Sequence, residues 1–174
     1  KAGLYTINAD YTIKLLAGLV EEGGKLYYYE NGIKTAKGLV FEGGKYYFIG
    51  ADCYALGEGV HWINDKNLNG LTDPNGEALK AGLYTVNADL TVKILAGLVE
   101  EGGKLYYYEN GQVAVDKGLV LVGGNYYFIG ADGYALGEGV HWINDKNLNG
   151  LKTPGEQELK AGLYVVNADL TVKI

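Results

Sequence analysis

The chain has 174 residues, 48% of them hydrophobic, so it is long and apolar enough to bury a core. Its net charge is −6 and every basic residue is a lysine placed singly, which disfavours nucleic acid and anionic membrane surfaces as partners. The single cysteine, Cys53, excludes an internal disulfide framework and a multi-cysteine metal site, and no run approaches the ~20 apolar residues of a membrane-inserted span.

Glycine and tyrosine dominate the composition, with 28 and 16 residues. Glycine supplies the positive φ angles of tight turns, and tyrosine suits a half-buried pleated surface. No segment keeps a helical period for the ~10 residues that a helix needs without meeting glycine. The composition therefore predicts an all-β fold of short strands joined by turns.

A long repeat organises the whole chain. Its opening Lys-Ala-Gly-Leu-Tyr begins at Lys1 and returns at Lys80 and Lys160. A repeat of this kind is best settled before any local structure is assigned. We divide the chain into long repeat 1 (1–79), long repeat 2 (80–159) and the start of a third repeat (160–174). Because the chain stops inside a recurring element, we expect it to be a fragment of a longer array.

A shorter hairpin unit recurs inside each long repeat. Residues 18–28 are followed by a similar segment at 38–47, and in both a Gly-Gly pair separates a short apolar strand from an aromatic one. Such pairs, like Asn31-Gly32, are signals of two-residue hairpin turns. A lone hairpin is marginal in water. We therefore expect the hairpins to stack on neighbouring repeats of the same chain, through tyrosine rings, into an elongated β-solenoid.

The short unit also carries a family resemblance. The motif Gly-Leu-Val-x-x-Gly-Gly-Lys-x-Tyr-Tyr, with Asn-Gly or Ala-Asp-Gly beyond it, resembles the cell-wall-binding repeats of choline-binding proteins, streptococcal glucan-binding proteins and the carboxy-terminal repeats of large clostridial toxins. The resemblance covers residues 18–37, 38–59, 97–117 and 118–139. It implies a β-solenoid of hairpins, a cell-surface or secreted location, and binding of choline or sugars between successive hairpins.

The chain departs from the choline-binding pattern at its tryptophan positions. Recognition of a quaternary ammonium depends on an aromatic cage through cation–π attraction. In the Gly-Trp position of that family this chain has leucine, and in the Trp-Tyr-Tyr position it has leucine or tyrosine: Leu19, Leu39, Leu98 and Leu119, then Leu26, Tyr46, Leu105 and Tyr126. A glucan or another glycan, or no ligand, therefore fits better than choline.

The strongest candidates for a binding site are the paired His-Trp dipeptides. Residues 46–71 and 126–151 differ only where Cys53 faces Gly133. This near-identity predicts one site in each long repeat, although recent gene conversion would give the same pattern. The predicted ligand-binding residues are His61, Trp62, Tyr47 and Tyr54, and in the second copy His141, Trp142, Tyr127 and Tyr134. The alternative is that each tryptophan anchors a hairpin core and that the tyrosines pack structurally.

Two polar loops resemble the first half of an EF-hand loop, with oxygen ligands at positions 1, 3 and 5 and glycine at 6. Calcium is therefore a candidate ion, and no other cofactor is expected. The candidate ligands are Asp65, Asn67 and Asn69, then Asp145, Asn147, Asn149 and Glu156. No helices are expected to flank either loop, so the alternative is a hairpin loop closed by Asn-Gly.

Enzymatic chemistry finds little support in the sequence. The chain has no serine and no arginine, its two histidines stand at equivalent repeat positions, and Cys53 has no evident base beside it. We predict a non-catalytic, cell-surface or secreted repeat module that binds a cell-wall or host glycan. The alternative is a structural or adhesive spacer array with no small ligand, in which calcium could stabilise the loops.

Overall fold

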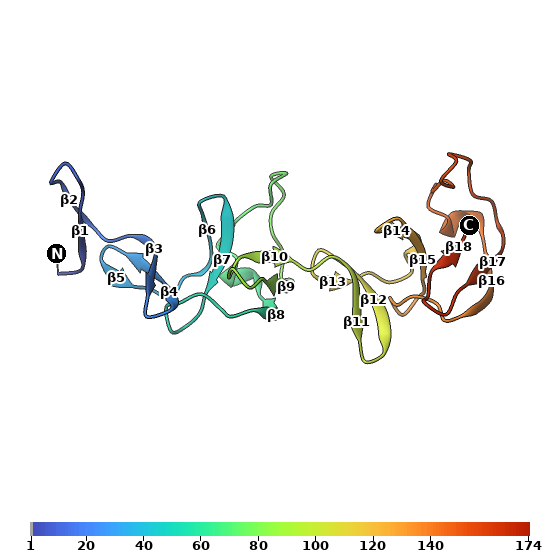
Figure 1. Cartoon of the computed structure of the whole chain (residues 1–174), viewed down its shortest axis with the longest axis horizontal. Coiled ribbons are helices and arrows are strands. Elements are labelled where there is room, and N and C mark those ends of the chain that lie inside the picture. The colour runs from blue at the N-terminus through green and yellow to red at the C-terminus, as the bar shows by residue number, and fades with distance from the viewer. Residues whose placement is uncertain (1) are drawn as a thin grey trace. The chain divides into compact units, whose positions relative to one another are not determined.

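The computed structural model describes residues 2–174, and its regular structure is almost entirely antiparallel β-sheet (Figure 1). The all-β architecture of tandem hairpins expected from the sequence is confirmed. The chain divides into two compact units, unit 1 (Lys1–Leu95) and unit 2 (Ala96–Ile174). Within residues 2–174 there is no helix of the length and apolarity that crossing a membrane requires.

Unit 1 consists of small sheets that follow one another along the chain. They are β1 (Tyr5–Ile7) with β2 (Ile13–Leu15); β3 (Gly18–Glu22) with β4 (Lys25–Glu30) and β5 (Ile33–Lys34); β6 (Gly38–Glu42) with β7 (Lys45–Ile49); and β8 (Gly59–Ile63) with β9 (Gly82–Val86) and β10 (Val92–Ile94). A short 3₁₀ turn, η1 (Asp65–Asn67), lies between β8 and β9.

Unit 2 repeats the order of β3 to β10, with one change in the sheets. The first sheet contains β11 (Gly97–Glu101), β12 (Lys104–Glu109) and β13 (Gln112–Val113). The second joins five strands in the order β14 (Gly118–Val122), β15 (Asn125–Ile129), β18 (Val172–Lys173), β17 (Gly162–Val166) and β16 (Gly139–Ile143), with η2 (Asp145–Asn147) after β16. In unit 2, a bridge between Tyr126 and Val172 joins the two hairpins into one sheet.

The glycine pairs form the tight turns that the sequence predicted. Gly23 and Gly24 join β3 to β4 with φ angles of 58° and 75°, and Asn31 and Gly32 join β4 to β5 with 52° and 79°. Two successive positive φ angles are the signature of a type I′ turn, whose twist matches that of the flanking strands.

The central hairpin of unit 1 lies between two cores. Leu39 and Val40 are neighbours on β6, and they are only 1% and 6% exposed. Their side chains point to opposite faces of the hairpin. Leu39 packs with Ile63 and Tyr84, whereas Val40 packs with Ile49 and a set of partly buried residues from β3 and β4. Stacking of hairpins therefore buries both faces, which explains apolar runs that do not alternate.

The structural units are offset from the long sequence repeats. β9 begins just after Lys80, the start of long repeat 2, yet it pairs with β8 of long repeat 1. The register places Ile63 opposite Gly82 and Gly59 opposite Val86. Unit 1 therefore ends at Leu95, because the opening hairpin of one repeat completes the sheet of the repeat before it.

Candidate functional site

The two tryptophans lie on exposed faces of their strands. Trp62 is on β8 and Trp142 on β16, and their side chains are 61% and 66% exposed. Alternate residues of a strand point to opposite faces, so Val60 shares the outer face with Trp62, while Ile63 enters the core at 1% exposure. The alternative in which each tryptophan anchors a hairpin core is therefore not what the structure shows.

The paired strand extends each tryptophan into an apolar face. Trp62 lies opposite Leu83 on β9, and Trp142 lies opposite Leu163 on β17. We define the Trp face of unit 1 as Val60, Trp62, Leu83 and Thr85, and the Trp face of unit 2 as Val140, Trp142, Leu163 and Val165. The ring and its neighbours could pack against the apolar side of a flat ligand such as a pyranose ring.

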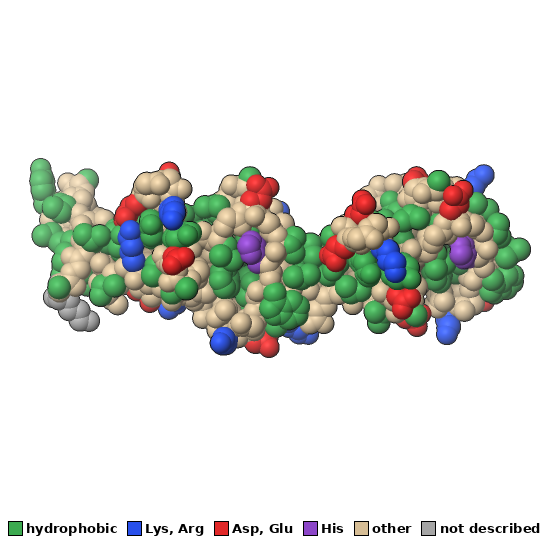
Figure 2. Space-filling model, turned by 90° about the horizontal axis from the view of Figure 1, so that it is seen from below, with side chains coloured by type: hydrophobic (Ala, Val, Ile, Leu, Met, Phe, Trp, Pro, Cys, Tyr) green, Lys and Arg blue, Asp and Glu red, His purple; other side chains and the backbone are tan. Residues whose placement is uncertain are grey.

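The histidines brace the turns that lead into these strands. The Nε2 atom of His61 lies 3.0 Å from the carbonyl oxygen of Gly57, and that of His141 lies 2.9 Å from that of Gly137. His61 is next to Trp62 on β8 and so points to the other side of the strand. One histidine reaches the surface in each unit, beside hydrophobic side chains and uncharged atoms (Figure 2). The structure therefore places each histidine next to its Trp face but not on it.

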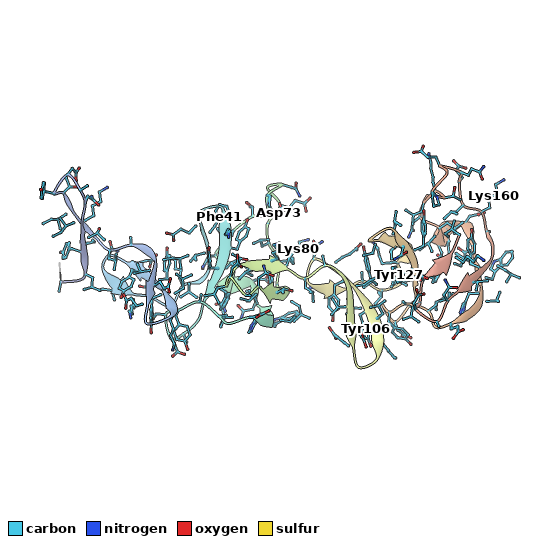
Figure 3. The ribbon with its side chains drawn as sticks, in the orientation of Figure 1. Phe41, Asp73, Lys80, Tyr106, Tyr127 and Lys160 are labelled. Carbon is cyan, nitrogen blue, oxygen red and sulfur yellow. The ribbon has the colours of Figure 1, made fainter. Side chains whose placement is uncertain are left out.

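The four predicted tyrosines belong to other contacts. Tyr47 packs with the cluster around Val40 and Ile49, and Tyr127, which is labelled in Figure 3, occupies the equivalent cluster of unit 2. Tyr54 makes an edge-to-face contact with Tyr27, with ring centroids 5.7 Å apart. Its counterpart, Tyr134, makes the same contact with Tyr106 at 5.6 Å. The structure thus assigns these rings to the hairpin stack and leaves the tryptophans outside it.

The candidate calcium loops join neighbouring parts of the stack through hydrogen bonds. In unit 1 the Asp65 carboxylate accepts a hydrogen bond from the Ala81 backbone N–H at 2.8 Å. The Asn69 side-chain amide donates to the carbonyl oxygens of Lys37 and Leu39, at 2.6 and 2.8 Å. In unit 2, Asn149 and Asp145 repeat these bonds with Lys117, Leu119 and Ala161. The loops thereby link β6 and β14 to the strands that follow.

The remaining candidate ligands do not converge with these side chains. The backbone N–H groups of Asn67 and Asn147 donate to the Asn64 and Asn144 side chains, which cap η1 and η2. Glu156 is exposed in a turn with φ of 63°. Among residues 2–174 no group of three or more His, Cys, Asp or Glu side chains is arranged to hold a metal ion. Calcium binding stays a prediction from the sequence.

Unit 1 also contains a groove that the sequence analysis missed. Its volume is about 970 Å³, and it lies between the β6–β7 hairpin, the loop before β9 and the β9–β10 hairpin. Buried Leu39, Tyr84 and Val92 line it, and Lys45 and Asp89 form an ion pair at its edge with a separation of 3.3 Å. The sequence feature that could have indicated this groove is the recurring Asn-Ala-Asp-x-Thr turn, which stands at residues 87–91.

The edge of the groove is held by its own hydrogen bonds. The Thr91 hydroxyl and backbone N–H both donate to Asp89 Oδ1, and these bonds lower the Asp89 pKa to about 2, with a smaller contribution from Lys45. Asp73 accepts from the backbone N–H groups of Asn75 and Glu77. Phe41 on β6 and Asp73 on the loop both project at this end of unit 1 (Figure 3). The groove offers an apolar floor with a polar rim.

The two copies differ at this groove, whereas their Trp faces differ only where Val165 replaces Thr85. Long repeat 2 has Asn125, Leu121 and Thr153 where long repeat 1 has Lys45, Phe41 and Asp73. The ion pair and the ring contact between Phe41 and Tyr46, with centroids 4.7 Å apart, are therefore features of the first copy. Each unit therefore has one candidate surface that contains a tryptophan at the same position of the repeat, namely its Trp face.

Comparison with known proteins gives no match to a protein-family model and no match to a curated protein sequence. Among solved structures, the chain is similar to choline binding protein F from Streptococcus pneumoniae in the presence of a peptidoglycan analogue, with 17% identity, a TM-score of 0.40, and 97% of this chain and 55% of that chain covered. It is also similar to CbpJ from the same species, with 20% identity, a TM-score of 0.30, and 91% and 48% covered.

A third similar structure is the modular autolysin LytC from Streptococcus pneumoniae, with 15% identity, a TM-score of 0.28, and 89% of this chain and 41% of that chain covered. The chain thus spans about half the length of these proteins. The structures to which the chain is similar therefore include choline-binding proteins, one of the groups that its hairpin motif resembles.

Proposed function

We propose that the chain is a non-catalytic repeat module that binds a carbohydrate polymer through its Trp faces, one in each unit. The observation that carries this proposal is the matched exposure of Trp62 and Trp142, at 61% and 66%. An exposed indole contributes little to the core. Its flat apolar ring, flanked by Val60 or Val140, is suited to stacking against the apolar side of a pyranose ring.

Two similar sites suit a polymeric ligand. Stacking of one sugar on one indole is weak, but a chain that carries two sites binds a repeating polymer more strongly, because the second contact occurs at a high effective concentration. The net charge of −6 and the scattered lysines give no basic stripe for nucleic acid. The proposed partner is therefore a cell-wall or host glycan, and the proposed location is the cell surface or the extracellular space.

The test compares Trp62→Ala, Trp142→Ala and the double variant for retention on polymeric glucan and on isolated cell wall. Because both side chains lie outside the cores, we expect melting temperatures close to that of the unsubstituted chain. Retention should weaken in each single variant and be lost in the double variant. Tyr11→Asn is the matched control, since Tyr11 is 88% exposed, lies outside both Trp faces and has a φ of 63° that asparagine tolerates.

Undiminished retention of the double variant would show that the Trp faces do not bind glycan. An equal loss of retention in the Tyr11→Asn control would also contradict a specific role of the Trp faces. Melting temperatures measured on the same preparations exclude unfolding as the cause of any loss.

A structural spacer is the second candidate function, and one observation favours it. The side chains of Asp65 and Asn69 both bond to backbone groups of other elements, so the loops reinforce the stack instead of facing a ligand. A spacer would show no retention on any glycan, with or without the tryptophans. Small-angle X-ray scattering on the whole chain would test the elongated β-solenoid expected for either function.

A further inference from the structure

In unit 1 a lysine of the chain itself occupies a cage of aromatic and acidic side chains. The Lys34 Nζ atom lies 3.4 Å from the centroid of the Tyr27 ring and 5.8 Å from that of Tyr29. It also lies 2.8 Å from Glu22 Oε2. The Tyr29 hydroxyl donates to the other oxygen of Glu22 at 2.6 Å. The ammonium group is thus held by ring faces and by a carboxylate that is itself fixed in place.

Unit 2 contains the same frame on β11 and β12. The Tyr108 hydroxyl donates to Glu101 Oε1 at 2.8 Å, as Tyr29 does to Glu22. Tyr108 is 3% exposed, and its burial together with the Glu101 carboxylate raises its pKa to about 12, so the hydroxyl stays a donor at neutral pH. Tyr106, on β12 in Figure 3, takes the place of Tyr27.

The outer wall of the cage is also the same in the two copies. Tyr27 and Tyr54 are 5.7 Å apart at 74°, and Tyr106 and Tyr134 are 5.6 Å apart at 75°. The ammonium groups of Lys25 and Lys104 lie 4.0 Å from the Tyr54 and Tyr134 centroids in both cases. Any difference in what the two cages hold must therefore arise from another residue.

The two cages differ in the residue that pairs with the buried tyrosine on the neighbouring strand. Lys34 on β5 pairs with Tyr29, and Val113 on β13 pairs with Tyr108. Valine is short and uncharged, so it cannot place an ammonium group over Tyr106. In the part of unit 2 that the structure describes, Glu101 forms no ion pair with a lysine.

We propose that Glu101, Tyr106 and Tyr108 form a binding site for a protonated primary amine supplied by a ligand. The first copy shows the geometry that such a group adopts in this frame. The short distance from Lys34 Nζ to Glu22 requires N–H donation, so the site takes a primary ammonium and not a quaternary one. An amino sugar and a lysine side chain both carry this group. This site goes beyond the Trp faces and does not depend on them.

The affinity of the site is set by a partly exposed cation–π contact and a partly exposed ion pair. Both are weak in water and are screened by salt. Lys34 holds its position because it is tethered to the frame. A free amine has no tether, so binding is expected in the millimolar range and should weaken as ionic strength rises.

The test titrates n-butylammonium, which copies the end of a lysine side chain, into the whole chain with ¹³C-labelled tyrosine rings, observed by NMR. The unsubstituted chain should show one saturable site. Val113→Lys should make binding at least about tenfold weaker, because the new side chain fills the cage as Lys34 does. Glu101→Gln should have the same effect through loss of the carboxylate, and circular dichroism reports whether both variants are folded.

The reverse substitution in unit 1, which removes the lysine from its cage, should create a second binding site for butylammonium. The double variant Lys34→Val, Cys53→Gly gives the first copy the residues of the second, and it should show two butylammonium sites instead of one. Tetramethylammonium should bind more weakly than butylammonium. Absence of saturable binding, undiminished binding by Val113→Lys, or equal binding of tetramethylammonium would each overturn the proposal. Glucosamine and Nα-acetyl-lysine amide then distinguish a sugar source of the amine from a peptide source.

Discussion

The Cγ1 methyl group of Val113 occupies the position that a Cβ atom at residue 133 would need, so Gly133 is matched to Val113. In unit 1 the corresponding residues are Lys34 and Cys53, and the lysine side chain reaches over Tyr27 instead. The one difference between residues 46–71 and 126–151 is therefore linked to a second difference outside those segments. Unit 1, with lysine in place of that valine, has the side chain of Cys53 at the position of Gly133.

This pairing predicts the effect of adding one carbon atom to unit 2. Gly133→Ala should destabilise the chain by about 2–4 kcal/mol, because the methyl group overlaps Val113 and because Gly133 has a φ of 79° that alanine adopts at a cost. The second substitution Val113→Ala should recover the part due to overlap. Urea unfolding measures both effects, and an unchanged midpoint for Gly133→Ala would contradict the predicted contact.

The Asn149 amide should contribute measurably to the stability of unit 2. Its two donated hydrogen bonds, to the carbonyl oxygens of Lys117 and Leu119, link the η2 loop to β14. Asn149→Gly keeps the left-handed backbone, with φ of 55°, but removes both bonds, so we expect a loss of about 1–3 kcal/mol. Asn110→Gly is the control, because Asn110 has a φ of 52° and lies exposed in a hairpin turn. Equal effects of the two variants in urea unfolding would assign the loss to the backbone alone.

Calcium addition distinguishes an ion-binding loop from a hydrogen-bonded one. The structure gives Asp65 and Asp145 backbone N–H partners at 2.8 Å, so both loops can fold without an ion. We therefore expect the melting temperature of EDTA-treated protein to stay the same when calcium is added. A ligand that binds only the folded state would raise it. A rise in melting temperature on calcium addition that is lost in the double variant Asp65→Asn, Asp145→Asn would support the calcium site predicted from the sequence.

Acid should destabilise unit 1 through Asp89. The pKa of this carboxyl is lowered from 3.8 to about 2 in the folded state, mainly by the Thr91 hydroxyl. A lowered pKa contributes stability above the unfolded value, and this contribution is lost as pH falls through the folded value. The melting temperature should therefore fall between about pH 4 and pH 2, and Asp89→Asn should reduce the fall. Asp52→Asn, at an exposed turn, is the control, and an identical acid profile for Asp89→Asn would contradict the assignment.

The local elements of this protein follow from its sequence. Gly-Gly and Asn-Gly pairs such as Gly23-Gly24 and Asn31-Gly32 favour two-residue turns with positive φ, and the flanking Tyr and Val residues suit strands. These preferences act over a few residues and need no partner from elsewhere in the chain. The repeat likewise places His61-Trp62 and His141-Trp142 at equivalent positions, and their histidine hydrogen bonds and tryptophan exposures are similar in the two units.

Burial was decided only by the tertiary structure. Leu39 and Phe41 share one face of β6, yet they are 1% and 53% exposed, because Leu39 packs with Ile63 and Tyr84 of the sheet that follows. The sequence likewise left open whether Trp62 anchors a core or faces solvent. It could not show that Lys34 fills its cage. Each of these outcomes depends on which hairpin packs against which, and a local pattern determines turns and strands but not the neighbours that cover them.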